Sequence, residues 1–165
     1  MGRFEVLPAP ARENFILHYT LTLDATSAAL VLGLDSIKDP WACKLSVAAS
    51  DSSESIERSV DLIGTFNQLI GLRVERAWES EGVTIQKGVD PLGATAMVFW
   101  RRTVEVDNSQ LSRVVSKQLA LNAGVKRVYA NGPNTLDNLA GSGERYSVRQ
   151  VEEDFARLMF DVRDV

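Results

Sequence analysis

Three helix-start signals most strongly constrain how this chain of 165 residues can fold. In each, a side chain with an acceptor oxygen stands three residues before Glu or Gln, at Asp51–Glu54, Asp107–Gln110 and Ser147–Gln150. The first side chain of such a pair can accept from an unpaired amide of the first helical turn, and the second can reach back to the cap residue. An apolar stripe at helical spacing follows each signal. The sequence therefore predicts amphipathic helices over residues 52–70, 108–122 and 148–162.

Segments with alternating apolar and polar residues, typical of β-strands, surround and separate the first two helices. They predict strands over residues 15–23, 41–48, 72–78, 83–86, 94–106 and 125–129. This order favours an α+β fold with a mixed, mainly antiparallel sheet, two helices on one face and a C-terminal helix. We expect a ferredoxin-like split βαβ core with one extra strand, and an irregular α+β sheet is the alternative.

The chain divides into four segments around one domain, as its length suggests. Residues 1–14 form an extended N-terminal arm, because Pro8 and Pro10 disfavour a helix there. Residues 15–130 are the α+β core, residues 131–146 are a loop rich in Gly and Asn, and residues 147–165 hold the C-terminal helix. A loop of this length is often functional or mobile.

Composition excludes several classes of protein. The single cysteine, Cys43, rules out internal disulfides and a cysteine-based zinc site, and it suits a reducing compartment. No apolar run is long enough to span a membrane, and the N-terminal residues lack the apolar segment of a secretory signal. We therefore expect a soluble cytoplasmic or intracellular protein with no membrane, metal or cofactor. The net charge of −4 is uneven, because residues 71–150 carry 11 basic and 8 acidic side chains.

No set of residues in the sequence predicts catalysis. His18 is the only histidine, and although Asp24 lies near it in sequence, no nucleophile is placed beside this pair. Cys43 alternates in register with Trp41 and Leu45, which is typical of a buried thiol. The loop of residues 140–147 has the glycines of a phosphate loop but lacks its Lys-Ser or Lys-Thr ending. We expect that the protein is not an enzyme.

Aromatic and basic residues on two predicted strands suggest contact with single-stranded nucleic acid. The candidate contacts are Phe99, Arg101, Arg102, Lys126 and Arg127. Stacking of bases on aromatic side chains of a sheet is how many RNA-binding domains work. However, side chains alternate between the two faces of a strand, so Phe99 and Arg101 share one face while Arg102 lies on the other. The glycine-rich motif of such domains is also absent.

The C-terminal helix is a candidate subunit interface. Its apolar residues repeat at spacings of 3, 4, 3 and 4: Val148, Val151, Phe155, Leu158 and Val162. Such a short helix is marginal alone, so its stripe must dock on its own sheet or on a neighbouring subunit. The acidic side chains of this helix would complement a basic ridge at Arg113 and Lys117 on another copy. A chain ending at Tyr146 should then stay folded but lose its oligomeric state.

These observations favour a non-enzymatic structural or assembly subunit that acts through protein–protein contacts as a homo-oligomer. A component of a viral or phage particle is one example. The alternative is a domain that binds single-stranded nucleic acid through its sheet face, and a small-molecule enzyme built around His18 comes third.

Overall fold

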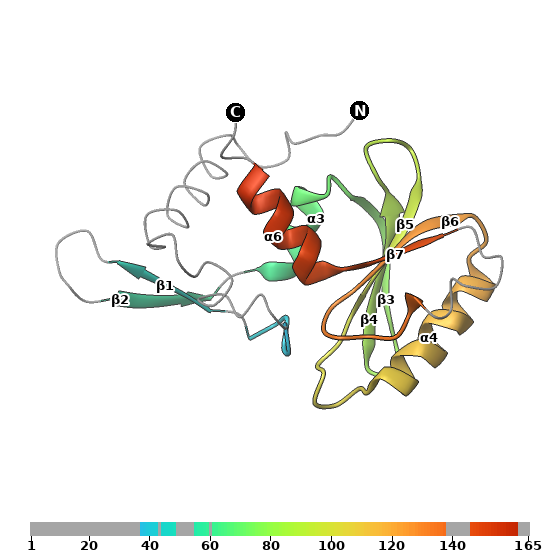
Figure 1. Cartoon of the computed structure of the whole chain (residues 1–165), viewed down its shortest axis with the longest axis horizontal. Helices are drawn as coiled ribbons and strands as arrows, with labels where there is room; N and C mark the ends of the chain where they lie inside the picture. The colour runs from blue at the N-terminus through green and yellow to red at the C-terminus, as the bar shows by residue number, and fades with distance from the viewer. Residues whose placement is uncertain (1–36, 43, 49–54, 60, 138–145, 162–165) are drawn as a thin grey trace.

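The computed structural model describes residues 37–42, 44–48, 55–59, 61–137 and 146–161 (Figure 1). The expected arm of residues 1–14 and the strand of residues 15–23 lie outside these residues, as do His18, Cys43 and Val162.

Five of the described strands form one sheet in which they lie in chain order. They are β3 (Arg73–Ser80), β4 (Val83–Val89), β5 (Thr95–Trp100), β6 (Val125–Ala130) and β7 (Ser147–Gln150). The pairs β3–β4 and β4–β5 are antiparallel, whereas β5–β6 and β6–β7 are parallel. The α+β class and the mixed sheet are confirmed. The sheet is not mainly antiparallel, because its second half is parallel.

Helix α4 (Asn108–Leu121) makes the crossover between β5 and β6 and begins where the sequence predicts. The Asp107 carboxylate accepts from the Gln110 amide at 2.8 Å, as an N-cap should. The Gln110 side chain also donates to the Glu81 carbonyl at 2.9 Å, which ties the start of α4 to the turn between β3 and β4. Since β5 and β6 are neighbours, they form an unsplit βαβ unit with α4, and the expected split βαβ arrangement is not found among the described strands.

Helices cover both faces of the sheet, and the predicted placement of the first two helices on the same face is wrong. One face packs against α4, and the other packs against α3 (Leu62–Leu69) and α6 (Val151–Asp161) (Figure 1). The crossover rule fixes the side of α4, because α4 joins two parallel neighbours. Helix α3 leads into β3, an edge strand of the antiparallel half, so the same rule does not determine its side.

The first predicted helix is much shorter than expected. Residues 55–59 form β2 (Ser55–Ser59), which pairs antiparallel with β1 (Lys44–Ala48) in a separate two-stranded sheet. The cap of α3 is Asp61, whose carboxylate accepts from the Gly64 amide at 2.9 Å. A Cβ atom at Gly64 would collide with this carboxylate. A glycine that would weaken the interior of a helix over residues 52–70 thus lies in the first turn of α3, next to the true cap.

The third helix-start signal, Ser147–Gln150, does not begin a helix. Residues Ser147–Gln150 form β7, with Val148 beside Val128 of β6, and α6 begins only at Val151. A four-residue segment with one apolar side chain cannot distinguish a helical period from a strand period. Pairing with β6, which is remote in sequence, decides the conformation.

Candidate functional site

Three buried polar side chains meet at the carboxyl ends of the parallel strands. Arg101 directly follows β5, Asn131 directly follows β6, and Glu152 lies in the first turn of α6 after β7. Their exposed fractions are 2%, 0% and 4%. Folds with parallel strands usually bind ligands at this edge of the sheet. We call Arg101, Asn131 and Glu152 the carboxyl-edge cluster and treat it as the candidate site.

Asn131 connects the end of β5 to the segment that precedes β1. Its side-chain oxygen accepts from the Arg101 amide at 2.8 Å. Its side-chain nitrogen donates to the carbonyls of Arg101 at 2.9 Å and Ile37 at 2.7 Å. The amide of Asn131 thus acts as a peptide group would in a sheet, and it satisfies buried backbone atoms on both sides.

Arg101 holds two loops together from inside the protein. Its guanidinium donates to the carbonyls of Val106 at 3.0 Å and Pro133 at 2.8 Å, and to the side-chain oxygen of Asn108 at 2.8 Å. Burial lowers the pKa of Arg101, and the negative charges of Glu152 and Asp107 oppose this shift. Its buried Nε atom has no hydrogen-bond partner among the described residues. Arg101 therefore closes the β5–α4 connection and is not available at the surface.

Glu152 accepts two backbone hydrogen bonds through one carboxylate oxygen. Its Oε1 atom accepts from the amides of Ile37 at 2.8 Å and Gly132 at 2.6 Å. Burial raises the pKa of Glu152, and these hydrogen bonds and one from Gln150 oppose the increase. The Oε2 atom is buried and has no hydrogen-bond partner in the described part of the chain. The carboxylate is therefore held in place by two backbone segments from different parts of the chain.

The carboxyl-edge cluster fixes residues Ile37–Trp41, which we call the strap. Asn131 and Glu152, which we call the clamp, bind the carbonyl and the amide of the same strap residue, Ile37. The Ile37 side chain is buried in the core that contains Phe155. A further backbone bond runs from the Thr103 amide to the Lys38 carbonyl at 2.9 Å. This arrangement holds a backbone segment of the same chain, and among the described residues it places no nucleophile beside a base.

The strap also has an outer contact. The Arg102 side chain donates to the Asp39 carboxylate at 3.3 Å, and its guanidinium lies over the Trp41 ring with its central carbon 4.9 Å from the ring centre. Arg102 also pairs with Glu105 at 3.8 Å. The exposed Arg102 therefore has partners on the strap and on the β5–α4 connection.

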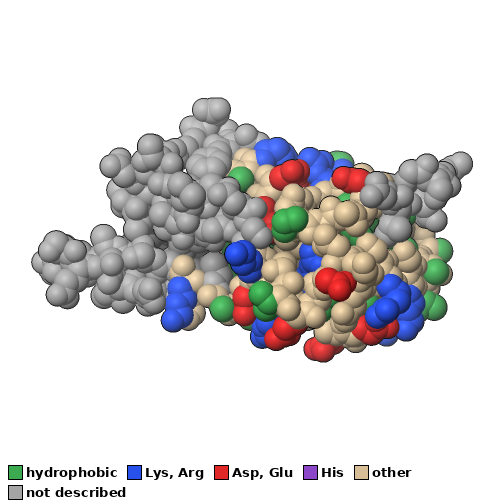
Figure 2. Space-filling model, turned by 60° about the horizontal axis from the view of Figure 1, so that its bottom comes forward, with side chains coloured by type: hydrophobic (Ala, Val, Ile, Leu, Met, Phe, Trp, Pro, Cys, Tyr) green, Lys and Arg blue, Asp and Glu red, His purple; other side chains and the backbone are tan. Residues whose placement is uncertain are grey.

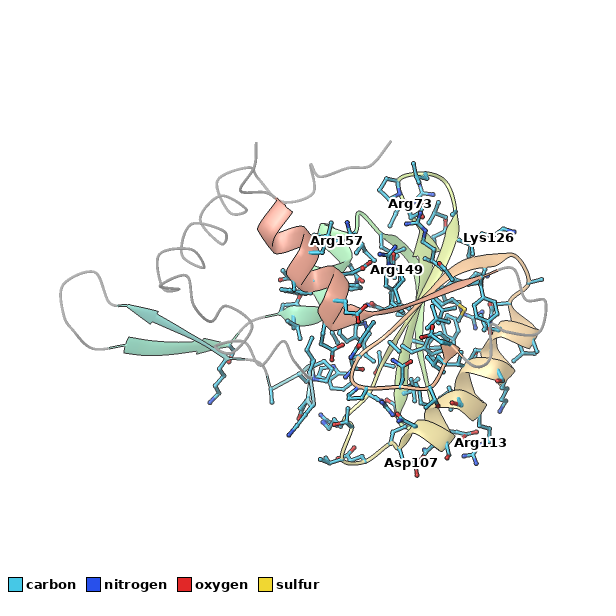
Figure 3. The ribbon with its side chains drawn as sticks, in the orientation of Figure 1. Arg73, Asp107, Arg113, Lys126, Arg149 and Arg157 are labelled. Carbon is cyan, nitrogen blue, oxygen red and sulfur yellow. The ribbon has the colours of Figure 1, made fainter. Side chains whose placement is uncertain are left out.

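The predicted nucleic-acid residues do not come together on one surface. Phe99 is fully buried beneath α4, and Arg101 is buried in the carboxyl-edge cluster. Because helices cover both faces of the sheet, neither Phe99 nor Arg101 can contact a base. Lys126 is exposed near the start of β6 (Figure 3), whereas Arg127 pairs with the buried Asp90 carboxylate at 3.4 Å.

The predicted interface stripe divides between two parts of the same chain. Val151 and Phe155 are fully buried in the core beside α3, so neither side chain is free to contact another subunit. Val148 lies in β7 and is half-buried on the α4 face, and Leu158 is half-buried on α6. The acidic Asp154 pairs with Arg149 at 3.0 Å and Arg157 at 3.7 Å in the same chain (Figure 3).

The basic ridge also has its partner within the chain. Arg113 lies 2.8 Å and Lys117 3.9 Å from the Glu81 carboxylate, in the turn between β3 and β4. The hydrogen bond and the charge of Arg113 lower the pKa of Glu81, with a smaller effect from Lys117. Glu81 and Gly82 both adopt positive φ, which is typical of the tight turn of a β-hairpin. The ridge therefore fixes this turn against α4.

Sequence reasoning missed Asn131, Glu152 and the strap. An Asn-Gly pair after a strand, here Asn131-Gly132, signals a turn, and Gly132 has a φ of +77°. Nothing in the sequence separates Glu152 from the acidic residues next to it. Its role depends on Ile37, which is 115 positions away.

Within the described ranges, no group of three or more His, Cys, Asp and Glu residues could hold a metal ion. No described helix is long and apolar enough to cross a membrane. No protein-family model, curated protein or solved structure matches this chain.

Proposed function

We propose that the chain is a non-enzymatic structural subunit that assembles with copies of itself, as the subunits of viral or phage particles do. The observation that carries this proposal is the hairpin of β1 and β2. It forms its own sheet and stands away from the five-stranded sheet (Figure 1). An isolated two-stranded hairpin is at best marginally stable in water. Among the described strands, β1 and β2 pair only with each other, and contact with another subunit would add packing to this hairpin.

The base of the hairpin is anchored on the core domain, as we expect for a hairpin that contacts a neighbouring subunit. The strap precedes β1 and is held by the clamp, and α3 follows β2 and buries Leu62 and Phe66 in the core. Both ends of the hairpin are therefore fixed on the core domain. Contacts made by the hairpin would therefore connect a neighbouring subunit to the core domain.

The surface beside the hairpin base has the composition of an interaction site. Trp41 is 43% exposed beneath Arg102, and Val104 on the adjacent loop is 85% exposed. Tryptophan and arginine contribute strongly to the binding energy of many protein interfaces. On the face in Figure 2, acidic and basic side chains are interspersed rather than separated by sign. On this face, the pattern favours a protein partner over a nucleic acid, which usually requires a basic surface.

The nucleic-acid alternative has lost two of the residues on which it depended. Phe99 and Arg101 are buried, while Arg102 and Arg127 are paired with Asp39 and Asp90. We therefore include nucleic-acid binding only as an alternative outcome of the test. A shift of the purified protein on a single-stranded oligonucleotide at low salt would restore this alternative.

Light scattering after size exclusion tests the assembly proposal. The test variant replaces residues 45–58 with Asn-Gly, because Lys44 and Ser59 are direct partners and a two-residue turn can join them. We expect the wild type to form a discrete multimer and the shortened variant to lose it while retaining its thermal transition. The matched control is Lys126→Ala, at the amino end of β6, which should keep the mass of the wild type. A monomeric wild type, or a shortened variant of unchanged mass, would contradict the proposal.

A further inference from the structure

We infer that Arg127, Tyr129 and Arg149 form a binding site for a phosphate-type oxyanion, either inorganic phosphate or the phosphate group of a small monoester. The site lies on the face of the sheet that packs against α3 and α6, and it uses none of the residues of the carboxyl-edge cluster. The inference concerns ligand binding by a single chain, so it goes beyond the proposed assembly and does not depend on it.

The register of two parallel strands brings the three side chains together. On β6, Arg127 and Tyr129 are two residues apart and lie beside Ala96 and Val98 of β5, which belong to the core on the α3 and α6 side. On β7, Arg149 is the direct partner of Tyr129. Neighbouring strands are about 4.8 Å apart and alternate residues of one strand about 6.6 Å apart. Long arginine side chains on both sides of Tyr129 can therefore reach one ligand.

Two buried carboxylates hold the arginines in place. Asp90 accepts from two backbone amides of the β4–β5 turn at 2.9 Å each, and its other oxygen lies 3.4 Å from Arg127 Nε. Asp154 accepts from Arg149 Nε at 3.0 Å. The two carboxylates are 4% and 5% exposed, whereas the side chains of Arg127 and Arg149 are 35% and 44% exposed. Each guanidinium is therefore fixed from the interior and reaches the solvent.

The geometry of these ion pairs leaves most of each guanidinium for another acceptor. Arg127 and Arg149 approach their carboxylates through Nε, and the two Nη atoms carry four of the five N–H groups of an arginine. Arg113 is different, because it approaches Glu81 through Nη2, and that carboxylate is 36% exposed. An exposed Nη fork is the group that binds phosphate and carboxylate oxygens in pairs.

The Tyr129 hydroxyl adds a neutral donor to the site. Burial raises the pKa of this hydroxyl, the hydrogen bond and charge of Arg127 and the charge of Arg149 oppose the increase, and the charge of Asp154 adds to it. The hydroxyl therefore keeps its proton at neutral pH. Its pKa responds to both arginines, as expected for groups that share one site.

The donors fit a tetrahedral phosphate better than a carboxylate. Two guanidinium forks and a hydroxyl need more acceptor oxygens than the two of a carboxylate, and phosphate supplies them. Arg157 lies 3.7 Å from Asp154, so three arginines and two aspartates gather in this part of the protein (Figure 3). The excess of one positive charge favours an anionic ligand.

Isothermal titration of the full chain with inorganic phosphate tests the inference, and sodium chloride at equal ionic strength is the reference. We expect saturable binding with one site per chain. Arg149→Lys keeps a positive charge beside Asp154 but loses the fork, so its affinity should fall about tenfold. Tyr129→Phe removes only the hydroxyl from a buried ring and should cause a smaller loss.

The matched control is Arg113→Lys, which makes the same substitution at an exposed arginine outside the site and should keep the affinity of the wild type. Circular dichroism checks that each variant keeps the wild-type fold. Absence of saturable phosphate binding, or equal affinity in Arg149→Lys and the wild type, would overturn the inference. Binding of a single-stranded oligonucleotide that depends on Arg149, without binding of free phosphate, would also overturn it. A monomeric chain that binds phosphate would support this inference and contradict only the assembly proposal.

Discussion

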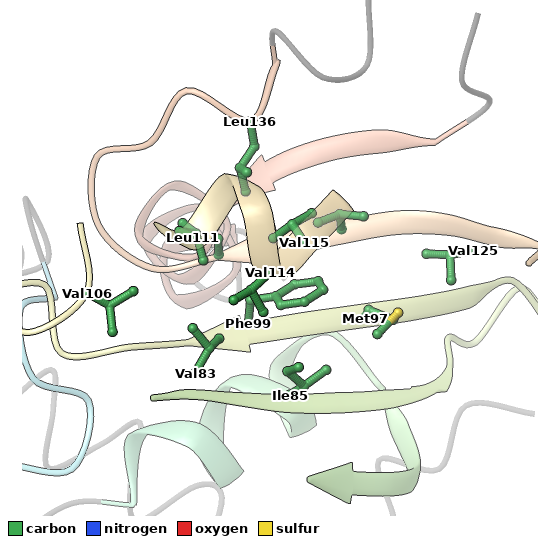
Figure 4. Packing of buried hydrophobic residues seen from close by; sticks show 12 residues of the cluster. Val83, Ile85, Met97, Phe99, Val106, Leu111, Val114, Val115, Val125 and Leu136 are labelled. Carbon is green, nitrogen blue, oxygen red and sulfur yellow. The ribbon is translucent and has the colours of Figure 1, made fainter. Parts of the chain in front are cut away.

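The two faces of the sheet differ in their side chains and in how far apart along the sequence the contributing residues lie. The buried side chains on the α4 face are aliphatic except for Phe99 and Met97, and they lie between Val83 and Leu136 (Figure 4). The opposite face is centred on aromatic rings, and its members run from Ile37 to Phe155. One face is therefore completed by consecutive elements, whereas the other is closed only when both ends of the described chain dock on it.

Phe66 is the centre of the aromatic face. Its ring meets Trp100 and Tyr129 edge-on, with centroids 5.6 Å and 5.5 Å apart, and lies nearly parallel to Phe155 at 6.3 Å. Edge-to-face geometry is a favoured arrangement of aromatic rings. Gln86 adds a polar contact on this face, because its side-chain oxygen accepts from Asn67 at 2.9 Å and Trp100 at 3.2 Å. Helix α3, strand β6 and helix α6 therefore depend on one another through this ring cluster.

The largest effect should follow removal of the chain after Tyr146. This truncation deletes β7 and α6, and with them the buried Val151 and Phe155 and both hydrogen bonds of Glu152. We expect loss of the cooperative thermal transition, measured by circular dichroism. This outcome replaces the sequence-based expectation that such a chain stays folded. A truncated chain with the wild-type transition would show that the aromatic face is not required for the fold.

The second prediction concerns the ring cluster. Phe66→Ala should lower the free energy of unfolding by about 3–5 kcal/mol, because it removes a fully buried aromatic ring. Denaturant titration measures this change. A smaller loss, of about 1 kcal/mol or less, would mean that the cavity collapses and that Phe66 is not the centre of this face.

A double-mutant cycle tests whether the two faces of the sheet are energetically independent. Phe66→Leu and Phe155→Leu should be non-additive by about 0.5–3 kcal/mol, because the two rings are in contact. The matched pair, Phe66→Leu with Leu111→Ala, lies on opposite faces and should be additive within about 0.5 kcal/mol. Equal coupling in the two pairs would show that the faces are not independent.

The same difference explains what could be predicted from the sequence. Strands β3 to β6 and helix α4 are neighbours both in sequence and in space, and the local alternation and the Asp107 cap predicted them. Two errors lie at Ser55–Ser59 and Ser147–Gln150, where pairing with another segment chose strand over helix. The strand predicted over residues 94–106 is also too long, because β5 ends at Trp100 and the Arg101 amide donates to the side chain of Asn131. The carboxyl-edge cluster was missed for a related reason. Glu152 and Ile37 meet only in the folded chain, and no local pattern encodes their contact.

The third prediction tests how the strap is held on the aromatic side. Glu152→Ala leaves the amides of Ile37 and Gly132 without their acceptor, and we expect a loss of about 2–3 kcal/mol in unfolding free energy. Glu152→Gln keeps an acceptor oxygen at this position and should lose less at neutral pH. Equal losses in the two variants would show that the charge, rather than the acceptor, holds the strap.

The pH dependence of the Gln variant has a defined sign. Burial raises the pKa of Glu152 above its ordinary value of 4.5, so between the ordinary and the raised value the folded state binds more protons than the unfolded state. The contribution of Glu152 to stability is therefore lost as pH rises through this window. We expect the unfolding free energy of the wild type, relative to Glu152→Gln, to fall as pH rises from about 4.5. A relative stability that rises with pH would contradict the raised pKa.

The smallest effect should come from the basic ridge on the α4 side. Arg113→Ala removes a hydrogen bond to an exposed carboxylate, and exposed ion pairs contribute little to stability, so the thermal midpoint should stay nearly unchanged. The measurable change is electrostatic. Without Arg113 the pKa of Glu81 should rise toward its ordinary value, because the hydrogen bond and charge of Arg113 are the largest causes of its lowering.

Lys117→Ala is the matched control for this pair, since Lys117 lies 3.9 Å from Glu81 and its charge has the smaller influence on the pKa of that carboxylate. Titration of Glu81 by NMR should therefore give a clear increase in pKa for Arg113→Ala and a slight one for Lys117→Ala. Raised salt should reduce the difference, because exposed charges are screened. Equal shifts in the two variants would mean that the short hydrogen bond from Arg113 does not persist in solution. The turn between β3 and β4 would then be held against α4 by the bond from Gln110 to the Glu81 carbonyl and by packing.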